Sequence, residues 1–344
     1  MEMTIFTAGS KRVGLGHLTR MRTLTTRLSW NTRVITTTPD TAVLVFAGTE
    51  AEIVPLKEGG ELSKEIIEHS RGTSVLVLDP PYLPDDLDGC TGPAWQLVAD
   101  LARERGIPVV RFTDEETPSR HSCDLLINDH PMASGFAADY GSLGGADHVL
   151  AGPRYFLIDP CHERATAKDG GLVVSFGGSD HNDIVQRLAP ALAELSATLP
   201  VHVVLGVVSG LDVADLPGLT VSKSLPPEVF AATIKGARLA LTASGNTLFE
   251  RVFHGVPGLS LAQFPRQHLI GKGFEELGLT RHLGLGLELN ASKLTREIID
   301  FVEDGEAMKT QMLACKALDV LKGGHEILSA IAGMVNADMK FSAP

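Results

Sequence analysis

The chain has 344 residues, of which 44% are hydrophobic and 21% are charged. This length predicts two domains of roughly 150 residues each, and this composition is typical of a folded globular protein. The net charge of −12 disfavours a nucleic-acid partner, because proteins of that class usually present a basic face to the phosphate backbone. We therefore expect no nucleic-acid partner, and any phosphate-binding site should be local.

The cysteines and the hydropathy pattern indicate the cellular compartment in which we expect the protein. Cys90, Cys123, Cys161 and Cys315 show no paired spacing, which indicates neither a disulfide framework nor a zinc site. No segment approaches the roughly 18 apolar residues of a membrane span, and the start lacks the pattern of a signal peptide. These features predict reduced thiols in a cytoplasmic protein without a membrane span.

The first part of the chain alternates short β-branched runs with segments of helical periodicity. This alternation predicts a parallel sheet with helices on both faces, in a first domain over residues 1–155. The pattern weakens over residues 131–145, where we expect a loop with a little helix, and residues 152–171 have linker composition. The expected strands are residues 3–7, 32–38, 74–78, 107–112 and 124–128.

The same alternation restarts after the linker and predicts a second α/β domain over residues 170–325. The tail from 293 to about 337 is expected to be mostly helix, with breaks at 304–306 and at Gly323-Gly324. A last helix within residues 325–344 is expected to return to the first domain. The fold class is therefore α/β, with two doubly wound sheets. The strands expected in the second domain are residues 172–176, 201–205, 219–221, 239–242 and 258–261.

The most informative segment follows the first expected strand and runs from Gly14 through Gly16 and His17 to Arg20. A glycine-rich turn at a helix N-terminus presents unpaired N–H groups and the positive end of the helix dipole, which suit a phosphate. We expect Gly14, Gly16 and Arg20 to bind substrate. His17 falls in the first turn, where the dipole favours a neutral imidazole that can act as a base.

A dinucleotide-binding loop is an alternative interpretation of these glycines. Asp40 follows the second expected strand at a plausible distance for a ribose contact. Thr19, however, occupies the position of the third glycine, and the turn over residues 8–13 is long. Both features disfavour a dinucleotide site and therefore a dehydrogenase.

Two loops of the second domain have the same composition of small residues and hydroxyls. Residues 175–180 follow the first strand of that domain, and residues 242–247 follow a later one, with Glu250 on the helix beyond. Such loops could hold a diphosphate, and the carboxylate could accept hydrogen bonds from two ribose hydroxyls. Ligands in open α/β sheets sit at the carboxyl ends of strands, which is where these loops begin.

Several motifs recur in an order that resembles a known family. They are residues 14–20, Asp79 with Tyr82, residues 112–115, 123–128, 152–155, 175–180 and 243–250. Together they resemble the nucleotide-sugar hydrolases of the pseudaminic acid pathway and the related spore-coat polysaccharide protein, over residues 4–285. The resemblance implies the GT-B fold, with two Rossmann-like domains facing a cleft. That fold is shared with the glycosyltransferase that adds N-acetylglucosamine to a peptidoglycan precursor.

The resemblance also implies hydrolysis of a UDP-linked diacetamido-trideoxy amino sugar, with inversion at the anomeric carbon. UDP is a fair leaving group whose charge helix N-termini and a nearby cation can stabilise, so we expect no metal and no cofactor. His17 would activate water, with Asp79 as the preferred orienting residue and Tyr82, Asp114 and Glu115 as further candidates. The second domain would hold UDP through Gly177, Gly178, Ser179, Ser244, Gly245, Asn246, Thr247 and Glu250.

One position departs from the family pattern. The family usually has Asn-Gln where this chain has Arg266 and Gln267, and both are expected to contact substrate. An arginine adds a fixed charge and five donors, so the identity of the sugar is in question. An inverting glycosyltransferase with a UDP-sugar donor and an unidentified acceptor is therefore the alternative, and a non-catalytic nucleotide-sugar sensor is a third interpretation. We expect a monomer, because the cleft of such a fold opens and closes.

Overall fold

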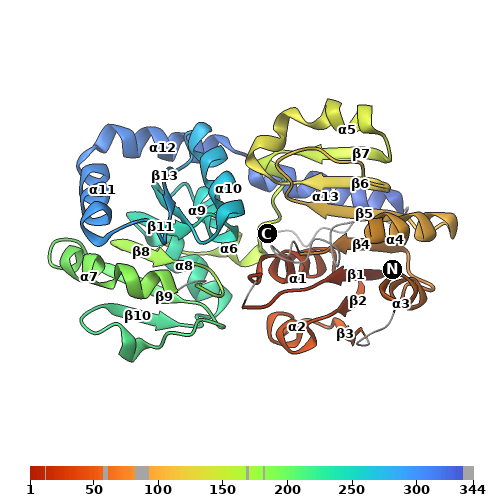
Figure 1. Cartoon of the computed structure of the whole chain (residues 1–344), viewed down its shortest axis with the longest axis horizontal. Coiled ribbons are helices and arrows are strands. Elements are labelled where there is room, and N and C mark those ends of the chain that lie inside the picture. Colours follow the sequence, from red (N-terminus) through yellow and green to blue (C-terminus); the bar gives the residue numbers. More distant parts are fainter. Residues whose placement is uncertain (12, 57–60, 82–92, 168–169, 181–182, 336–344) are drawn as a thin grey trace. The chain divides into compact units, whose positions relative to one another are not determined.

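The computed structural model describes residues 1–344 except residues 12, 57–60, 82–92, 168–169, 181–182 and 336–344. Its contacts divide the chain into two compact units. Unit 1 comprises Met1–Asp159 and Val320–Pro344, and unit 2 comprises Pro160–Asp319. Each unit contains one parallel sheet flanked by helices (Figure 1).

The sheet of unit 1 has seven strands in the order β3-β2-β1-β4-β5-β6-β7. This order reverses direction between β1 and β4, as in doubly wound folds. The strands are β1 Glu2–Thr7, β2 Asn31–Thr36, β3 Glu52–Pro55, β4 Val75–Asp79, β5 Val109–Thr113, β6 Cys123–Asn128 and β7 Ala146–Ala151. The helices are α1 Gly16–Leu28, α2 Pro39–Val45, α3 Leu62–His69, α4 Pro93–Glu104, α5 Ala137–Leu143 and α13 Val320–Met334, with short turns η1 Pro131–Gly135 and η2 Pro153–Tyr155.

The sheet of unit 2 has six strands in the order β10-β9-β8-β11-β12-β13, with the reversal between β8 and β11. Its strands are β8 Leu172–Ser175, β9 Val201–Leu205, β10 Thr220–Lys223, β11 Leu239–Ala243, β12 Gly258–Ala262 and β13 Arg281–Leu285. Its helices are α6 Pro160–Arg164, α7 Ile184–Ser196, α8 Pro227–Gly236, α9 Asn246–Phe253, α10 Pro265–Glu276, α11 Ala291–Glu303 and α12 Gly305–Ala317, with a short turn η4 Val213–Asp215.

The expectation of two parallel α/β sheets is confirmed, and each expected strand overlaps an observed one. Three strands were not predicted, namely β3, β7 and β13. All three lie at sheet edges, and none of their residues is buried. An edge strand has one neighbour and more solvent, so its sequence lacks the continuous apolar run that marks a central parallel strand.

The expected helix break at Gly323-Gly324 is wrong, because both glycines lie inside α13. The tail is interrupted instead between α12 and α13. A Cβ built at Gly323 would lie 1.9 Å from the carbonyl oxygen of Arg154, in the turn η2. The glycine therefore permits α13 to approach η2 closely, and a side chain at this position would prevent that contact.

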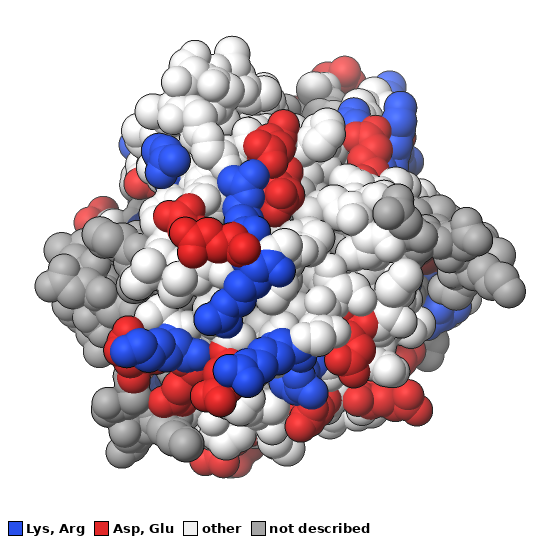
Figure 2. Space-filling view, turned by 90° about the vertical axis from the view of Figure 1, so that its right-hand side faces the viewer, with Lys and Arg blue, Asp and Glu red and all other residues white. Residues whose placement is uncertain are grey.

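Some further expectations concern thiols, charge and membranes. Cys123, Cys161 and Cys315 are buried free thiols, and Cys90 lies outside the described residues. Figure 2 shows a face on which basic and acidic side chains are interspersed. Among the described residues, no helix is long and apolar enough to cross a membrane.

Replacing Gly323 with alanine should destabilise the protein, because the new Cβ would overlap the Arg154 carbonyl. We expect a loss of about 1–3 kcal/mol in the free energy of unfolding, measured by urea denaturation. Gly333 provides a control on the same helix, since a Cβ there meets nothing within 4 Å. Its alanine variant should gain about 0.5–1 kcal/mol from helix propensity. Equal effects of the two substitutions would contradict the close approach of α13 to η2.

Candidate functional site

The loop between β1 and α1 folds back on itself before the helix begins. The N–H of Ser10 donates to the carbonyl of Gly14 at 3.1 Å, and the N–H of Gly14 donates to the carbonyl of Ser10 at 2.8 Å. Gly14 has a φ of +83°, a conformation that favours glycine. We expected Gly14 to bind a phosphate, but its N–H is already used inside the loop. Its role in the structure is the turn that leads into Gly16, the first residue of α1.

His17 contacts the carboxylate of Asp79 at the carboxyl end of β4. The two residues meet because β1 and β4 are neighbours, with Thr7 paired to Asp79 in the register. His17 Nδ1 lies 2.8 Å from Asp79 Oδ1. Since a carboxylate only accepts hydrogen bonds, Nδ1–H is the donor, and Nε2 is left as the acceptor of the ring. This arrangement orients a neutral imidazole to take a proton from a hydroxyl group.

Arg20, one turn along α1, holds the same carboxylate. Its Nε donates to Asp79 Oδ2 at 3.1 Å, and its Nη2 donates to Asp79 Oδ1 at 2.6 Å. The Nη2 atom also lies 3.3 Å from His17 Nδ1, but the shorter distance to Asp79 identifies the acceptor. Nη1 donates to Asp129 Oδ2 at 2.9 Å, and the guanidinium lies 5.3 Å from the ring centroid of Phe112.

Arg20 is therefore not placed as we expected. It is 6% exposed, and its three nitrogens all contact buried carboxylates. A guanidinium in these contacts positions Asp79, and through it His17, instead of reaching toward a substrate. Sequence reasoning missed this role because it depends on two carboxylates that are far away in the chain.

The pKa values of the two carboxylates beside Arg20 shift in opposite directions. Burial alone would raise the pKa of Asp79, but the charge of Arg20 and the hydrogen bonds from Arg20 and His17 hold it below the ordinary value. Burial dominates at Asp129 and, despite Arg20, raises its pKa to about 6. Asp79 is thus ionised at neutral pH, which the orientation of the His17 ring requires. Asp129 follows the predicted strand 124–128 directly, and this position was the signal that could have identified it.

Of the remaining candidates of the first domain, Glu115 does not join this cluster. Glu115 is buried, and its carboxylate accepts hydrogen bonds from Tyr140 Oη at 2.6 Å and from His121 Nε2 at 2.9 Å. Burial would raise the pKa of Glu115, but the bonds from His121 and Tyr140 lower it to about 2. Glu115 therefore belongs to a structural network. Asp114 acts on Arg20 and Asp129 through its charge, and Tyr82 lies outside the described residues.

In unit 2, the loops that follow β8, β11 and β12 come together. Gln263 Nε2 donates to the carbonyl of Phe176 at 3.0 Å, and Gln267 Oε1 accepts from the N–H of Gln263 at 3.0 Å. A Cβ at Gly245 would lie 3.4 Å from Gln267 Nε2.

The glycine loop after β8 is also close to the start of α9. A Cβ built at Gly177 would lie 3.7 Å from Thr247 Oγ1. Gly177, Gly245, Asn246, Thr247 and Gln267 are consequently gathered at the carboxyl edge of this sheet, beside the N-termini of α9 and α10.

The other residues expected to contact the nucleotide differ in how exposed they are and in what they contact. Ser244 is fully buried beside Gly271, and its hydroxyl has no hydrogen-bond partner among the described residues. Ser179 is buried, and Gly178 accepts a hydrogen bond from the N–H of Val208 at 3.0 Å through its carbonyl. Asp180 accepts from the N–H groups of the first two residues of α7, which are Ile184 at 3.1 Å and Val185 at 3.2 Å. Arg266 is partly exposed in the first turn of α10.

Glu250 lies at the end of a chain of imidazoles that sequence reasoning did not find. His162 Nε2 faces Glu250 Oε1 at 3.6 Å, and His162 Nδ1 lies 3.0 Å from His254 Nε2. Burial, with the charges of His162 and Lys235, lowers the pKa of His254 to about 3, so that ring is neutral at pH 7. One of these two rings donates to the other, and since a carboxylate only accepts hydrogen bonds, His162 Nε2 faces Glu250 as an N–H. His162 thus places an N–H near the Glu250 carboxylate, at a distance longer than a hydrogen bond.

The chain resembles known proteins in sequence and in fold. No family model matches the chain. The chain is similar to the spore coat polysaccharide biosynthesis protein SpsG of Bacillus subtilis (strain 168), with 23% identity over 304 residues, which cover 83% of this chain and 84% of that protein.

Two solved structures resemble the chain over nearly its full length. The calicheamicin glycosyltransferase CalG4 has a TM-score of 0.62 and 17% identity, covering 100% of this chain and 99% of that one. UGT2 of Phytolacca americana, complexed with UDP-2fluoro-glucose and pterostilbene, has a TM-score of 0.62 and 12% identity, covering 98% of this chain and 100% of that one. The chain has the GT-B fold. This result confirms the expected fold and supports the expected relation to the spore-coat polysaccharide protein, while the relation to the pseudaminic acid hydrolases stays a prediction.

Replacing Arg20 with glutamine should leave Asp79 buried without its strongest partner. We expect the free energy of unfolding at pH 7 to fall by about 3–5 kcal/mol, measured by urea denaturation. The pair stabilises only ionised Asp79, whose pKa is depressed in the folded protein. Its contribution is therefore present above the unfolded value of about 4 and is lost as the pH falls, so the deficit of the variant should shrink in acid.

Arg22 supplies the matched control for this experiment. It lies on the same helix and donates to Asp159 Oδ2 at 2.8 Å, but both side chains are partly exposed. Its glutamine variant should lose less than about 1 kcal/mol. A loss for Arg20→Gln no greater than that for Arg22→Gln would show that Arg20 does not keep Asp79 ionised.

Proposed function

We propose that this protein is an inverting glycosyltransferase that moves a sugar from a UDP-sugar to an acceptor hydroxyl or amine. The observation that carries the proposal is the His17 imidazole, held by the buried carboxylate of Asp79 with its Nε2 left as an acceptor. An acceptor needs this kind of base, because its O–H or N–H proton must leave as its oxygen or nitrogen attacks the anomeric carbon. The GT-B fold and the similarity to a polysaccharide biosynthesis protein support the same class of reaction.

The proposed reaction assigns a separate task to each unit. Unit 2 binds UDP at the loops after β8, β11 and β12, with Gly177, Gly245 and Thr247 near the diphosphate and Glu250 accepting from the ribose hydroxyls. In unit 1, His17 Nε2 takes the acceptor proton while the bond from the anomeric carbon to the UDP oxygen breaks. The N–H groups at the start of α9 stabilise the charge that develops on the departing diphosphate.

The hydrolase that we expected from the sequence uses the same residues with water as the acceptor. We place the transferase first because CalG4 is a glycosyltransferase and UGT2 was solved in complex with UDP-2fluoro-glucose. The two reactions differ in whether UDP is released without an added acceptor. The identity of the sugar is a further proposal, and a diacetamido-trideoxy amino sugar is the first one to test.

A phosphorus NMR time course with a panel of UDP-amino sugars separates these reactions. For a transferase, UDP release should be slow in buffer and should accelerate when an alcohol or amino-sugar acceptor is added. Substituting His17 with alanine should reduce the accelerated rate by about 10²- to 10⁴-fold, which is the usual contribution of positioned proton transfer. His148, an exposed residue of β7, provides the control, and its alanine variant should keep the full rate.

Three results would change this assignment. Rapid release in buffer alone that depends on His17 would identify a hydrolase. Saturable UDP binding without release under any condition would identify a sensor. A His17→Ala variant with unchanged turnover would mean that the base lies elsewhere.

The proposed position of the nucleotide predicts that Glu250 contributes to UDP affinity. Its glutamine variant should bind UDP less tightly by about 1.5–3 kcal/mol, the usual range for hydrogen bonds to a charged group, as measured by calorimetry. The substitution His162→Gln should also weaken UDP binding, because it removes the imidazole that faces the Glu250 carboxylate. Glu276 is exposed at the end of α10, and its glutamine variant should bind UDP normally. Unchanged affinity of the Glu250→Gln variant for UDP would mean that another residue binds the ribose.

A further inference from the structure

A pocket of about 430 Å³ opens in unit 2, away from the loops proposed to bind UDP. It is lined by the end of α8, the starts of β11 and β12, the end of α9 and one face of α12. Because Arg238 directly precedes β11 and Pro257 directly precedes β12, the pocket lies at the amino ends of these strands. The loops proposed to bind UDP follow the carboxyl ends of the same strands. The pocket therefore lies at the opposite end of these strands.

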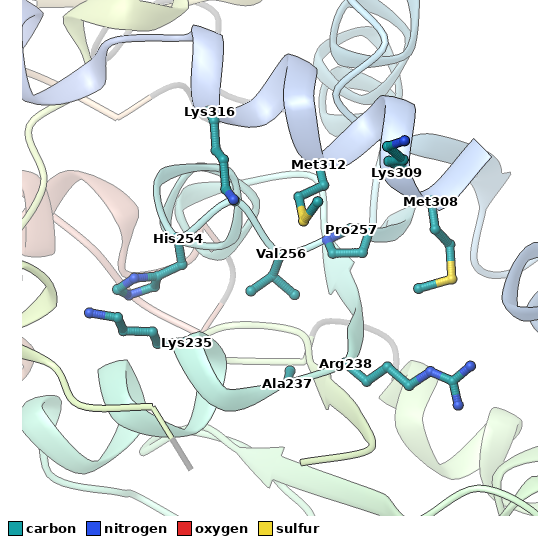
Figure 3. Close-up of a pocket in the computed structure, with 11 residues that line it drawn as sticks. Lys235, Ala237, Arg238, His254, Val256, Pro257, Met308, Lys309, Met312 and Lys316 are labelled. Carbon is teal, nitrogen blue, oxygen red and sulfur yellow. The ribbon is translucent and has the colours of Figure 1, made fainter. Parts of the chain in front are cut away.

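The lining of this pocket is strongly basic in a chain that carries a net charge of −12. Four of its eleven residues are Lys or Arg, and none is Asp or Glu. Figure 3 shows Lys309 and Lys316 on α12, with Lys235 at the end of α8 and Arg238 in the segment that follows. Lys309 and Lys316 are seven residues apart, which is about two helical turns and places them on one face of α12.

Nothing in the described part of the chain neutralises these four cations. None of them forms an ion pair with a described carboxylate, and Lys235 Nζ donates to the carbonyl of Ala165 at 2.7 Å. The charge of Lys235 also contributes, after burial and His162, to the low pKa of His254 at the rim. Like charges gathered around a cavity repel one another, and a bound anion would relieve this repulsion.

The floor between the cations is apolar. Val256 and Pro257 are buried there, and Met308 and Met312 extend from α12 into the same space (Figure 3). Methionine side chains adapt to irregular apolar groups. A ligand that fits both features has a phosphate for the cations and a short apolar portion for the methionines.

We infer that this pocket is a second anion site, which binds a phosphate ester with an adjoining apolar group. The ester could be a soluble metabolite or the headgroup of an anionic phospholipid, and the chemistry of recognition is shared. Lys309 and Lys316 supply the charge from α12, and Lys235 and Arg238 supply it from the segment around the start of β11. None of the residues that line the pocket is among those proposed to bind UDP.

Two probes test the inference on the full-length protein. Inorganic pyrophosphate is titrated by calorimetry, and sedimentation is measured with vesicles of phosphatidylcholine containing phosphatidylglycerol. The test variant is Lys309→Gln/Lys316→Gln, since both lysines are exposed on α12 and their loss should not disturb folding. The control is Lys272→Gln/Lys293→Gln, which removes the same charge from exposed positions of α10 and α11.

We expect the pocket variant to weaken binding of at least one probe by about tenfold or more, because two charge-assisted contacts are lost. The control variant should bind as the unmodified protein does. Pocket-dependent binding of pyrophosphate indicates a soluble ester, and pocket-dependent sedimentation with vesicles indicates a headgroup. The inference is overturned if neither probe binds, or if the pocket and control variants bind equally.

Discussion

The candidate base, His17, depends on a buried carboxylate that stays ionised because a neighbouring cation balances its charge. Asp79 is fully buried at the end of β4, where an isolated charge would protonate rather than persist. Arg20 prevents this through two hydrogen bonds and its fixed charge, and its third contact ties it to Asp129 beyond β6. The helix α1 therefore carries both the imidazole and the cation that keeps its partner ionised. The position of His17 follows from this pair as much as from the glycine loop that precedes the helix.

The sequence predicted the central part of each sheet well and the edges poorly. Central strands such as β8 and β11 are buried on both faces, so their residues form short apolar runs between turn residues. Edge strands such as β13 contain arginine and histidine and are only half buried, and their pattern does not differ from that of a loop. The two glycines inside α13 misled prediction for another reason. Gly323 permits a close approach to η2, and a contact between distant segments leaves no local signal.

The same distinction applies to the candidate site. His17, Asp79 and the loops of unit 2 could be predicted, because parallel strands bring their carboxyl ends to one edge of a sheet. What could not be predicted was how each side chain is occupied. Arg20, Ser244 and Glu115 have residue types that suit a ligand, yet the protein uses the first to hold Asp79, buries the second and bonds the third to His121 and Tyr140. Residue type limits the possible chemistry, but only packing shows which groups remain for a substrate.

The two anion sites that we propose in unit 2 lie at opposite ends of its strands and would attract anions by different means. At the carboxyl edge, helix N-termini and glycine loops offer backbone N–H groups, which bind a phosphate at a defined distance and orientation. At the amino edge, those N–H groups are absent from the ends of the incoming helices, whose C-termini carry partial negative charge. An anion can be bound there only if side-chain cations outweigh that charge. The four cations around the pocket meet this requirement, and since long, flexible side chains place charge less sharply than a backbone does, the pocket is suited to select ligands by charge and apolar contact more than by exact shape.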